Sequence, residues 1–442
     1  MIKGDKRIIR GWVMYDWANS VYNLVISSAI FPIFYDNITT KHFLEENNLE
    51  ALPEGMSVTV DFFGAELSSS VLISYVLSAS FLVVSFLSPM LSGVADYSGN
   101  KKRFMQFFCY LGAVSCMSLY FFDMVPLEVG MLSVFLASIG FWNSLVFYNA
   151  YLPEIAEPED HDRISARGFS MGYIGSMLLL MICLSIIMFI DEKYTSFCFL
   201  LVGIWWIGFS QFTYSVLPNN VFKKKVEKGI IWRGFKELKI VFKQFRKTYR
   251  LKRFLLSFFF YNTGVQTVML MAVIFAKKEV DWSEGGGDVG LIIAILLIQI
   301  LGAVGAFVMS RLSGFLGNVK TLGLSVIIWI GICAAAYIVT TPNEFYFLAA
   351  MVGLVMGGVQ ALSRSTYSKF LPETTDHASF FSFYDVAEKV GIVIGTFSFG
   401  FLEYALGSIR YSIFAVAAFF CVGLIALLFV PKNERLKTVT ES

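Results

Sequence analysis

Charged residues are scarce in this chain of 442 residues. They make up 15% of the sequence, whereas soluble globular proteins carry about 25%. Apolar residues account for 56%, and the mean hydropathy is +0.66. This shortage of charge excludes a soluble globular protein.

The residues used in metal, disulfide and nucleotide chemistry are also few or unsuitably spaced. His42, His161 and His377 are the only histidines; they fall in expected loops without HExxH spacing, and no GxxxxGK[ST] segment is present. The cysteines are dispersed through apolar segments without a CxxC pair: Cys109, Cys116, Cys183, Cys198, Cys333 and Cys421. We therefore expect no catalytic residue, metal site or cofactor, and no ATP-driven pump unless a partner supplies the energy.

Long apolar runs are what the sequence has in abundance. Runs of about 20 residues span a bilayer, and these must be helices because they are continuous rather than alternating. The basic and then apolar start lacks a cleavage pattern, so we interpret it as an uncleaved first span. We place twelve spans near residues 12–35, 69–93, 104–122, 130–151, 168–190, 197–217, 254–276, 288–310, 320–340, 345–367, 379–402 and 411–430.

Lysine and arginine are distributed unequally between the two sides of these spans. The side that contains the N-terminus carries 29 of the 35, the other side carries five, and Lys389 lies within a span. Positive charge is enriched in cytoplasmic loops. The bias therefore predicts a multi-pass membrane protein with both termini in the cytoplasm.

The two halves of the chain resemble each other at two points. LPE at 152–154 recurs at 371–373, 219 residues later, and GNKK at 99–102 is echoed by GNVK at 317–320. Such duplication is typical of secondary transporters, whose central site lies between the two halves. We expect an all-α fold with two pseudo-symmetric bundles of six helices each.

A basic linker is expected between the bundles. We place the N-terminal bundle at 1–217, the cytoplasmic linker at 218–253 and the C-terminal bundle at 254–442. A nucleic-acid site is disfavoured because the linker also carries an apolar stripe, which predicts an amphipathic helix on the inner membrane face. The stripe consists of Ile231, Phe235, Leu238, Phe242 and Phe245.

The first span contains the polar stretch YDWANSVYN. Its hydrophilic residues and a following serine recur at helical spacing as one stripe about 100° wide: Asp16, Asn19, Ser20, Asn23 and Ser27. An ionised side chain in mid-membrane costs about 2.5–3.5 kcal/mol even on the mildest scale. We therefore expect the stripe to line a polar cavity; hydrogen bonding that only holds helices together is the alternative.

Polar residues of other spans extend this expected cavity. The candidate substrate-binding residues are Asp16, Asn19, Asn23, Asn143, Asn262, Gln266, Gln360, Arg364 and Tyr384, with Arg364 near the cavity mouth. Because desolvation disfavours a charged carboxyl group, a carboxylate in the cavity could load and release a proton between transport states. The candidates for proton coupling are Asp16, Asp385 and Glu388.

The turn GVADYSGNKKR, between spans two and three, carries the expected gating residues Asp96, Lys101 and Arg103. Asp96 could cap the N-terminus of a neighbouring helix, where the helix dipole favours an anion. Lys389 follows Asp385 by four residues, so the two can share charge, and a buried pair could act as a gate latch. A solvated turn and an exposed pair are the alternatives.

The turn GVADYSGNKKR resembles the loop signature of the major facilitator superfamily. That family has twelve helices in two pseudo-symmetric halves, which agrees with the duplication. Tyr97 stands where the family usually carries Arg, and the second-half copy at 311–317 has Gly314 where the family carries Asp. The resemblance therefore implies a gate that leans on the first half.

Further motifs are similar to those of the vacuole-effluxer-like branch. In order, they are WxxYDWANS from Trp12, FP at 31–32, LPE at 152–154 with Arg163, YNTGVQT from Tyr261, QALSRS from Gln360, and FFSFY from Phe380 with Lys389. Fungal members are linked to amino-acid export from the vacuole, so the resemblance implies efflux of amino acids. Thr263 stands where the family often has Asp, which weakens a scheme with carboxylates in both halves.

Together these features predict a monomeric secondary transporter that works by alternating access. The expected partners are a small polar substrate, membrane lipids and a coupling proton. Another solute (sugar, peptide, organic acid or drug), a non-transporting sensor and a lipid scramblase are the alternatives. A membrane enzyme is disfavoured because no histidine lies within a span. The short loops favour a bacterial inner membrane, with a vacuolar membrane as the second choice.

Overall fold

The computed structural model describes residues 3–53, 57–218, 230–282 and 287–432. Within them, twelve helical segments are long and apolar enough to cross a membrane, as expected. The first half contains α1 (Lys6–Val21), α2 (Ile30–Asn47), α3 (Ser69–Ser98), α4 (Lys101–Ser118), α5 (Leu127–Asn149), α6 (Leu152–Ile155), α7 (His161–Phe189) and α8 (Thr195–Val216). The rest contains α9 (Ile230–Lys247), α10 (Tyr249–Glu279), α11 (Asp288–Leu316), α12 (Asn318–Ile338), α13 (Pro342–Lys369), α14 (His377–Leu406) and α15 (Ile409–Leu428).

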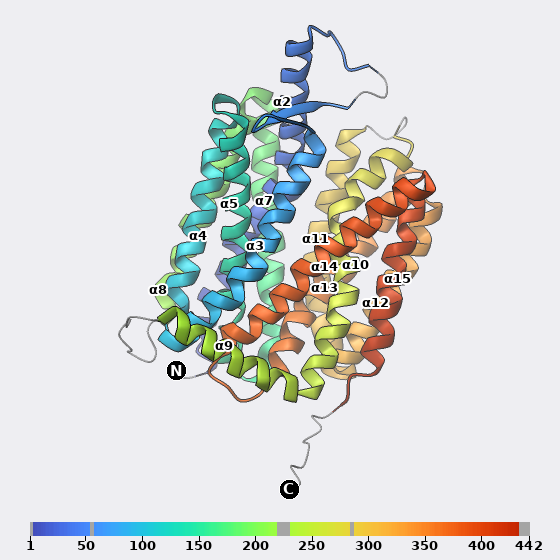
Figure 1. Cartoon of the computed structure of the whole chain (residues 1–442). Coiled ribbons are helices and arrows are strands. Elements are labelled where there is room, and N and C mark those ends of the chain that lie inside the picture. Colours follow the sequence, from blue (N-terminus) through green and yellow to red (C-terminus); the bar gives the residue numbers. More distant parts are fainter. Residues whose placement is uncertain (1–2, 54–56, 219–229, 283–286, 433–442) are drawn as a thin grey trace.

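The spanning helices form two bundles that stand side by side (Figure 1). One end of the molecule, where α1 begins, α15 ends and α9 lies, is called the basal face here. The opposite end, the hairpin face, carries the antiparallel strands β1 (Thr59–Phe62) and β2 (Ala65–Ser68). The division of the chain at 1–217, 218–253 and 254–442 stays a prediction.

The first span is longer and less regular than expected. Helical structure continues from Lys6 to Asn47, rather than over 12–35, and its end projects from the hairpin face (Figure 1). Residues Tyr22–Ala29 form a π-helical segment, a rare element that is frequent at functional sites. A π-helical turn contains more residues than an α-helical turn, so the face presented after Asn23 shifts along the sequence.

The linker helix α9 contacts α3 and α14, one helix from each bundle. Its backbone lies directly against α3, because a Cβ on Gly93 would clash with the carbonyl oxygen of Gly234. The ring of Phe245 lies 5.3 Å from the ring of Phe383 on α14. α9 thus touches both bundles at the basal face.

The predicted apolar stripe of α9 is described only in part. Residues 219–229 of the linker and the side chains of Ile231 and Phe235 lie outside the described residues. Phe245 is half-buried, whereas Phe242 is 48% exposed. The described end of the stripe therefore packs partly on protein, because α14 offers it an aromatic partner.

Within the C-terminal bundle, α11 and α13 approach each other through glycines. A Cβ on Gly357 would overlap the carbonyl oxygen of Gly302, and one on Gly305 would overlap that of Leu354. Small residues let membrane helices pack closely enough for extensive van der Waals contact. This contact holds together two helices that carry polar side chains toward the other bundle.

Replacing Gly357 with alanine should force α11 and α13 apart and destabilise the protein by about 1–3 kcal/mol. The measurement is thermal unfolding of the purified protein in detergent. Gly331→Ala is the matched control, because a Cβ placed on that α12 glycine has no atom of another described helix within 4 Å. An equal loss of stability in both variants would contradict the packing argument.

Candidate functional site: a polar cavity between the bundles

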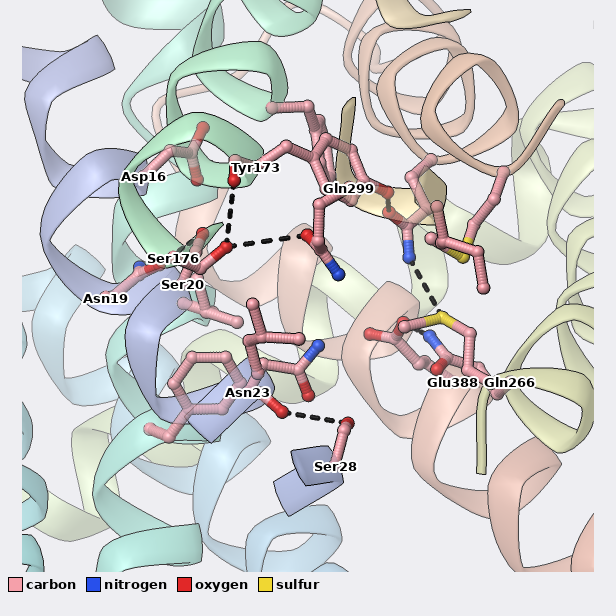
Figure 2. A pocket seen from close by; sticks show the side chains of 18 of the residues that line it. Asp16, Asn19, Ser20, Asn23, Ser28, Tyr173, Ser176, Gln266, Gln299 and Glu388 are labelled. Atoms are coloured by element: carbon pink, nitrogen blue, oxygen red, sulfur yellow. Dashed lines mark hydrogen bonds between the residues drawn. The ribbon is translucent and has the colours of Figure 1, made fainter. Parts of the chain in front are cut away.

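A cavity of about 190 Å³ lies between the two bundles. Helix α1 with the π-helical segment that follows it, α5 and α7 form one side of it, and α10, α11, α13 and α14 form the other (Figure 2). Its wall includes seven amide side chains, those of Asn19, Asn23, Asn149, Asn262, Gln266, Gln299 and Gln360. So many hydrogen-bonding groups suit a polar ligand.

Most of the polar residues selected from the sequence meet in this cavity. Those that line it are Asp16, Asn19, Asn23, Asn262, Gln266, Gln360, Arg364, Tyr384 and Glu388. Ser28 lines it in place of Ser27, because the π-helical segment changes the register of the polar face. Asn143 and Asp385 lie outside the lining.

Asn143 is buried within the N-terminal bundle, where its Nδ2 donates to the carbonyl oxygen of Ile139 at 3.0 Å. α5 turns Trp142, Leu145 and Asn149 toward the cavity. Successive helical residues are about 100° apart, so Asn143 projects beyond the edge of that face. The prediction that Asn143 lines the cavity is therefore wrong.

At the basal floor of the cavity, Asp16 of α1 pairs with Arg364 of α13. Its Oδ2 accepts hydrogen bonds from Nη2 of Arg364 at 3.0 Å and from the hydroxyl of Tyr148 at 2.7 Å. The two charged side chains are only 6% and 3% exposed. Gly168 of α7 makes room for the pair, because a Cβ there would overlap the carboxylate.

Arg364 reaches out of its own bundle into a socket of the N-terminal bundle. Its Nε donates to the hydroxyl of Ser165 at 2.9 Å, and its Nη2 donates to the carbonyl oxygen of Ser165 at 3.0 Å. The guanidinium carbon lies 4.2 Å from the ring centre of Phe169 and 4.8 Å from that of Trp12. Aromatic faces attract a guanidinium. These contacts hold Arg364 at the closed floor, so its expected position near the mouth stays a prediction for a conformation in which the floor opens.

A second charged cluster lies on α14. The ammonium of Lys389 is 3.1 Å from Oδ1 of Asp385 and 3.0 Å from Oε2 of Glu388, and its side chain is fully buried. It also lies 3.5 Å from the ring centre of Trp142 in the other bundle. Gln266 of α10 donates to Oε1 of Glu388 at 2.7 Å. One ammonium thus faces two carboxylates, and only Glu388 borders the cavity.

Below the cavity, Asp96 at the end of α3 reaches the start of α14 in the other bundle. Its Oδ2 accepts from the backbone N–H of Ser379 at 2.7 Å, and its Oδ1 from that of Ala378 at 3.2 Å. Nζ of Lys101 lies 3.5 Å from Oδ1 of Asp96 and also contacts Glu154. The helix dipole stabilises a carboxylate at this position.

Arg103, expected to act with Asp96 and Lys101, is exposed and takes no part in this basal contact. Several residues in these contacts were not foreseen: Asn149, Glu154, Ser165, Gln299 and His377. Asn149 and Gln299 could have been found as polar residues in apolar runs. Glu154 belongs to the repeated LPE motif, whereas Ser165 and His377 carry no such signal because they lie close to loops.

The inter-bundle contacts of Arg364 and Asp96 lie at the floor of the cavity or below it. The chain is therefore in a basal-closed conformation.

Structures of similar fold include a major facilitator superfamily transporter, FucP, in the outward conformation, with a TM-score of 0.67 and 12% identity over 97% of this chain and 99% of that chain. A bacterial homologue of the iron transporter ferroportin in the outward-facing state has a TM-score of 0.65, also at 12% identity, over 97% and 99%.

The fold is thus that of the major facilitator superfamily, and the family match and relatives below make the chain a membrane transporter of that type. Residues 4–439 match the family described as vacuole effluxer Atg22 like, and the chain belongs to this family. It is 29% identical to the uncharacterized MFS-type transporter YxiO of Bacillus subtilis (strain 168), over 98% of this chain and 97% of that protein. It is 24% identical to autophagy-related protein 22-1 of Penicillium rubens, over 98% and 91%.

Removing one partner of the Asp16–Arg364 pair should destabilise the protein by about 3–5 kcal/mol, because the other charge stays buried and unpaired. Asp16→Asn and Arg364→Gln should each lower the thermal unfolding midpoint, and the double variant should lose less than the sum. Glu403→Gln, which breaks a more exposed pair with Lys278, is the control and should cost less than about 1 kcal/mol. Additive losses in the double variant would show that the two charges do not interact.

Proposed function

We propose that the chain exports small zwitterions, amino acids first among them, by alternating access. The observation that carries this proposal is the amide-lined cavity between the bundles, closed at its floor by the Asp16–Arg364 pair. The family description as a vacuole effluxer supports efflux. A site between two bundles can be exposed to either side when the bundles rock about it.

The hydrogen-bonding pattern of the cavity supports a zwitterion. The Nδ2 atoms of Asn19 and Asn262 are buried and have no partner among the described residues. Oε1 of Gln299 accepts from Ser176 at 3.5 Å, which leaves its amino group for a ligand (Figure 2). The amino group of Gln299 can donate to a substrate carboxylate, and the cavity-facing Glu388 can accept from a substrate ammonium.

The charge bias of the sequence supports a cytoplasmic basal face. With that orientation, the basal-closed conformation faces away from the cytoplasm. Export would then require a second conformation in which the Asp16–Arg364 floor parts and the cavity loads from the cytoplasm. Both termini would lie in the cytoplasm.

Proton coupling fits the α14 cluster better than Asp16. Arg364 balances the charge of Asp16, whereas Lys389 balances only one of its two carboxylates. Asp385 also accepts a hydrogen bond from Ser88 of the other bundle at 3.1 Å. Separation of the bundles would break this bond and change the surroundings of the cluster. A proton taken up by Asp385 or Glu388 would neutralise the excess negative charge.

Purified protein in liposomes should exchange a labelled amino acid for the unlabelled one with saturable kinetics. Amino-acid amides and N-acetyl amino acids each lack one of the two charges, so we expect them to compete about tenfold more weakly or worse. Sugars and organic acids serve as comparison solutes. Ligand-induced stabilisation without flux would indicate a sensor, and exchange of sugars alone would contradict the proposed substrate.

Glu388→Gln should abolish accumulation driven by a pH gradient but retain exchange at equal pH, because glutamine keeps one acceptor oxygen but cannot carry a proton. Glu403→Gln on the same helix is the control, since that side chain pairs with Lys278 away from the cavity. Full accumulation by both Glu388→Gln and Asp385→Asn would refute coupling through this cluster.

A further inference from the structure

Asp162 has no role in the sequence-based predictions and lies outside the cavity lining. It is the second residue of α7, at the basal end of the N-terminal bundle, and is 8% exposed. Its Oδ1 accepts from Nδ2 of Asn318 and from the hydroxyl of Ser365, both at 2.6 Å. Its Oδ2 accepts from Nζ of Lys369 at 2.6 Å and from the hydroxyl of Ser313 at 3.0 Å.

All four donors belong to the C-terminal bundle, on α11, α12 and α13. A carboxylate offers about four lone-pair sites, so the opposite bundle saturates this one. Hydrogen bonds to a charged carboxylate are stronger than neutral ones. Because every donor lies across the interface, separation of the bundles at the basal face would remove all four bonds together.

The pseudo-symmetry of the two halves relates the hydrogen bonds of Asp162 to those of Asp96. The junction of α11 and α12 is the second-half copy of the junction of α3 and α4, and the end of α11 carries Gly314 where the end of α3 carries Asp96. Aligned on the histidine that begins each helix, α7 and α14 place Asp162 and Ala378 at the same position. Ala378 donates its backbone N–H to Asp96 across the first contact.

We propose that Asp162 is the gate residue of the second half, with carboxylate and donors exchanged between the two bundles. At the first contact the end of α3 carries the carboxylate of Asp96, and the start of α14 donates. At the second contact the start of α7 carries the carboxylate, and Ser313 and Asn318, which flank the junction of α11 and α12, donate. Each pseudo-symmetric contact therefore has its own anionic latch, although Gly314 implied a gate that leans on the first half.

This assignment concerns the conformational cycle and does not depend on which solute is carried. The bonds of Asp162 exist only while the basal face is closed, so they stabilise that state alone. A contact that is made in only one of two conformations shifts the equilibrium toward that conformation by the free energy that the contact contributes there. Loss of the charge should therefore raise the ratio of basal-open to basal-closed molecules about tenfold, which corresponds to about 1.4 kcal/mol.

The test is a distance measurement between two spin labels on the full chain in lipid nanodiscs, without added substrate. Glu159 and Lys320 are suitable label sites, because both are exposed at the basal face and they lie in different bundles. A Cys421→Ser background removes the exposed native cysteine. Asp162→Asn should move the distance distribution from the short, basal-closed population toward longer distances.

Asp160→Asn is the matched control, because that carboxylate lies two residues earlier and pairs with the neighbouring Arg163 at 2.9 Å. It should leave the distribution unchanged.

Ser365→Ala removes one donor but keeps the charge, so it should shift the distribution in the same direction by a smaller amount. An unchanged distribution in folded Asp162→Asn would overturn the proposal, and if that variant does not fold, an unchanged Ser365→Ala would do so. An equal shift in Asp160→Asn would overturn it as well.

Discussion

The buried ion pair between Asp16 and Arg364 is the interaction on which the rest of the structure depends. A carboxylate and a guanidinium can remain in the interior of a membrane protein only if they are paired and hydrogen-bonded on their remaining sides. Each bundle supplies one member of the pair, so forming it and closing the cavity floor are the same event. Tyr148 and Ser165 hydrogen-bond to the pair and the ring of Trp12 faces the guanidinium, which completes the socket.

The same requirement organises the contacts below the cavity. The carboxylates of Asp96 and Asp162 are each solvated by donors of the opposite bundle. If the bundles part, water can replace those donors, so opening exchanges hydrogen bonds rather than simply losing them. Two states joined by such an exchange can stay close in free energy, as alternating access requires. The amides above the floor then remain available for a solute in either state.

Packing inside each bundle follows a different rule from packing between bundles. Gly302 and Gly357 bring α11 and α13 together through backbone contact that cannot be exchanged for water. The basal contact between the bundles contains the ion pair and the carboxylate hydrogen bonds instead, beside a small cluster of Ala166, Ala306 and Ala361. This division suits rocking of two rigid bodies, because the rigid contacts are intrabundle and the exchangeable ones cross the interface.

The sequence by itself determined the twelve spans, their pseudo-repeat and most of the cavity wall, because hydropathy and helical period are local properties of the chain. Local period failed at Ser27, where a π-helical segment changes the register, and at Asn143, which α5 turns away from the cavity. Only the tertiary structure decided that Asp16 meets Arg364 across 348 residues, and that donors from three helices converge on Asp162. Which buried charges meet depends on how the two bundles dock, and no local spacing in the chain encodes that.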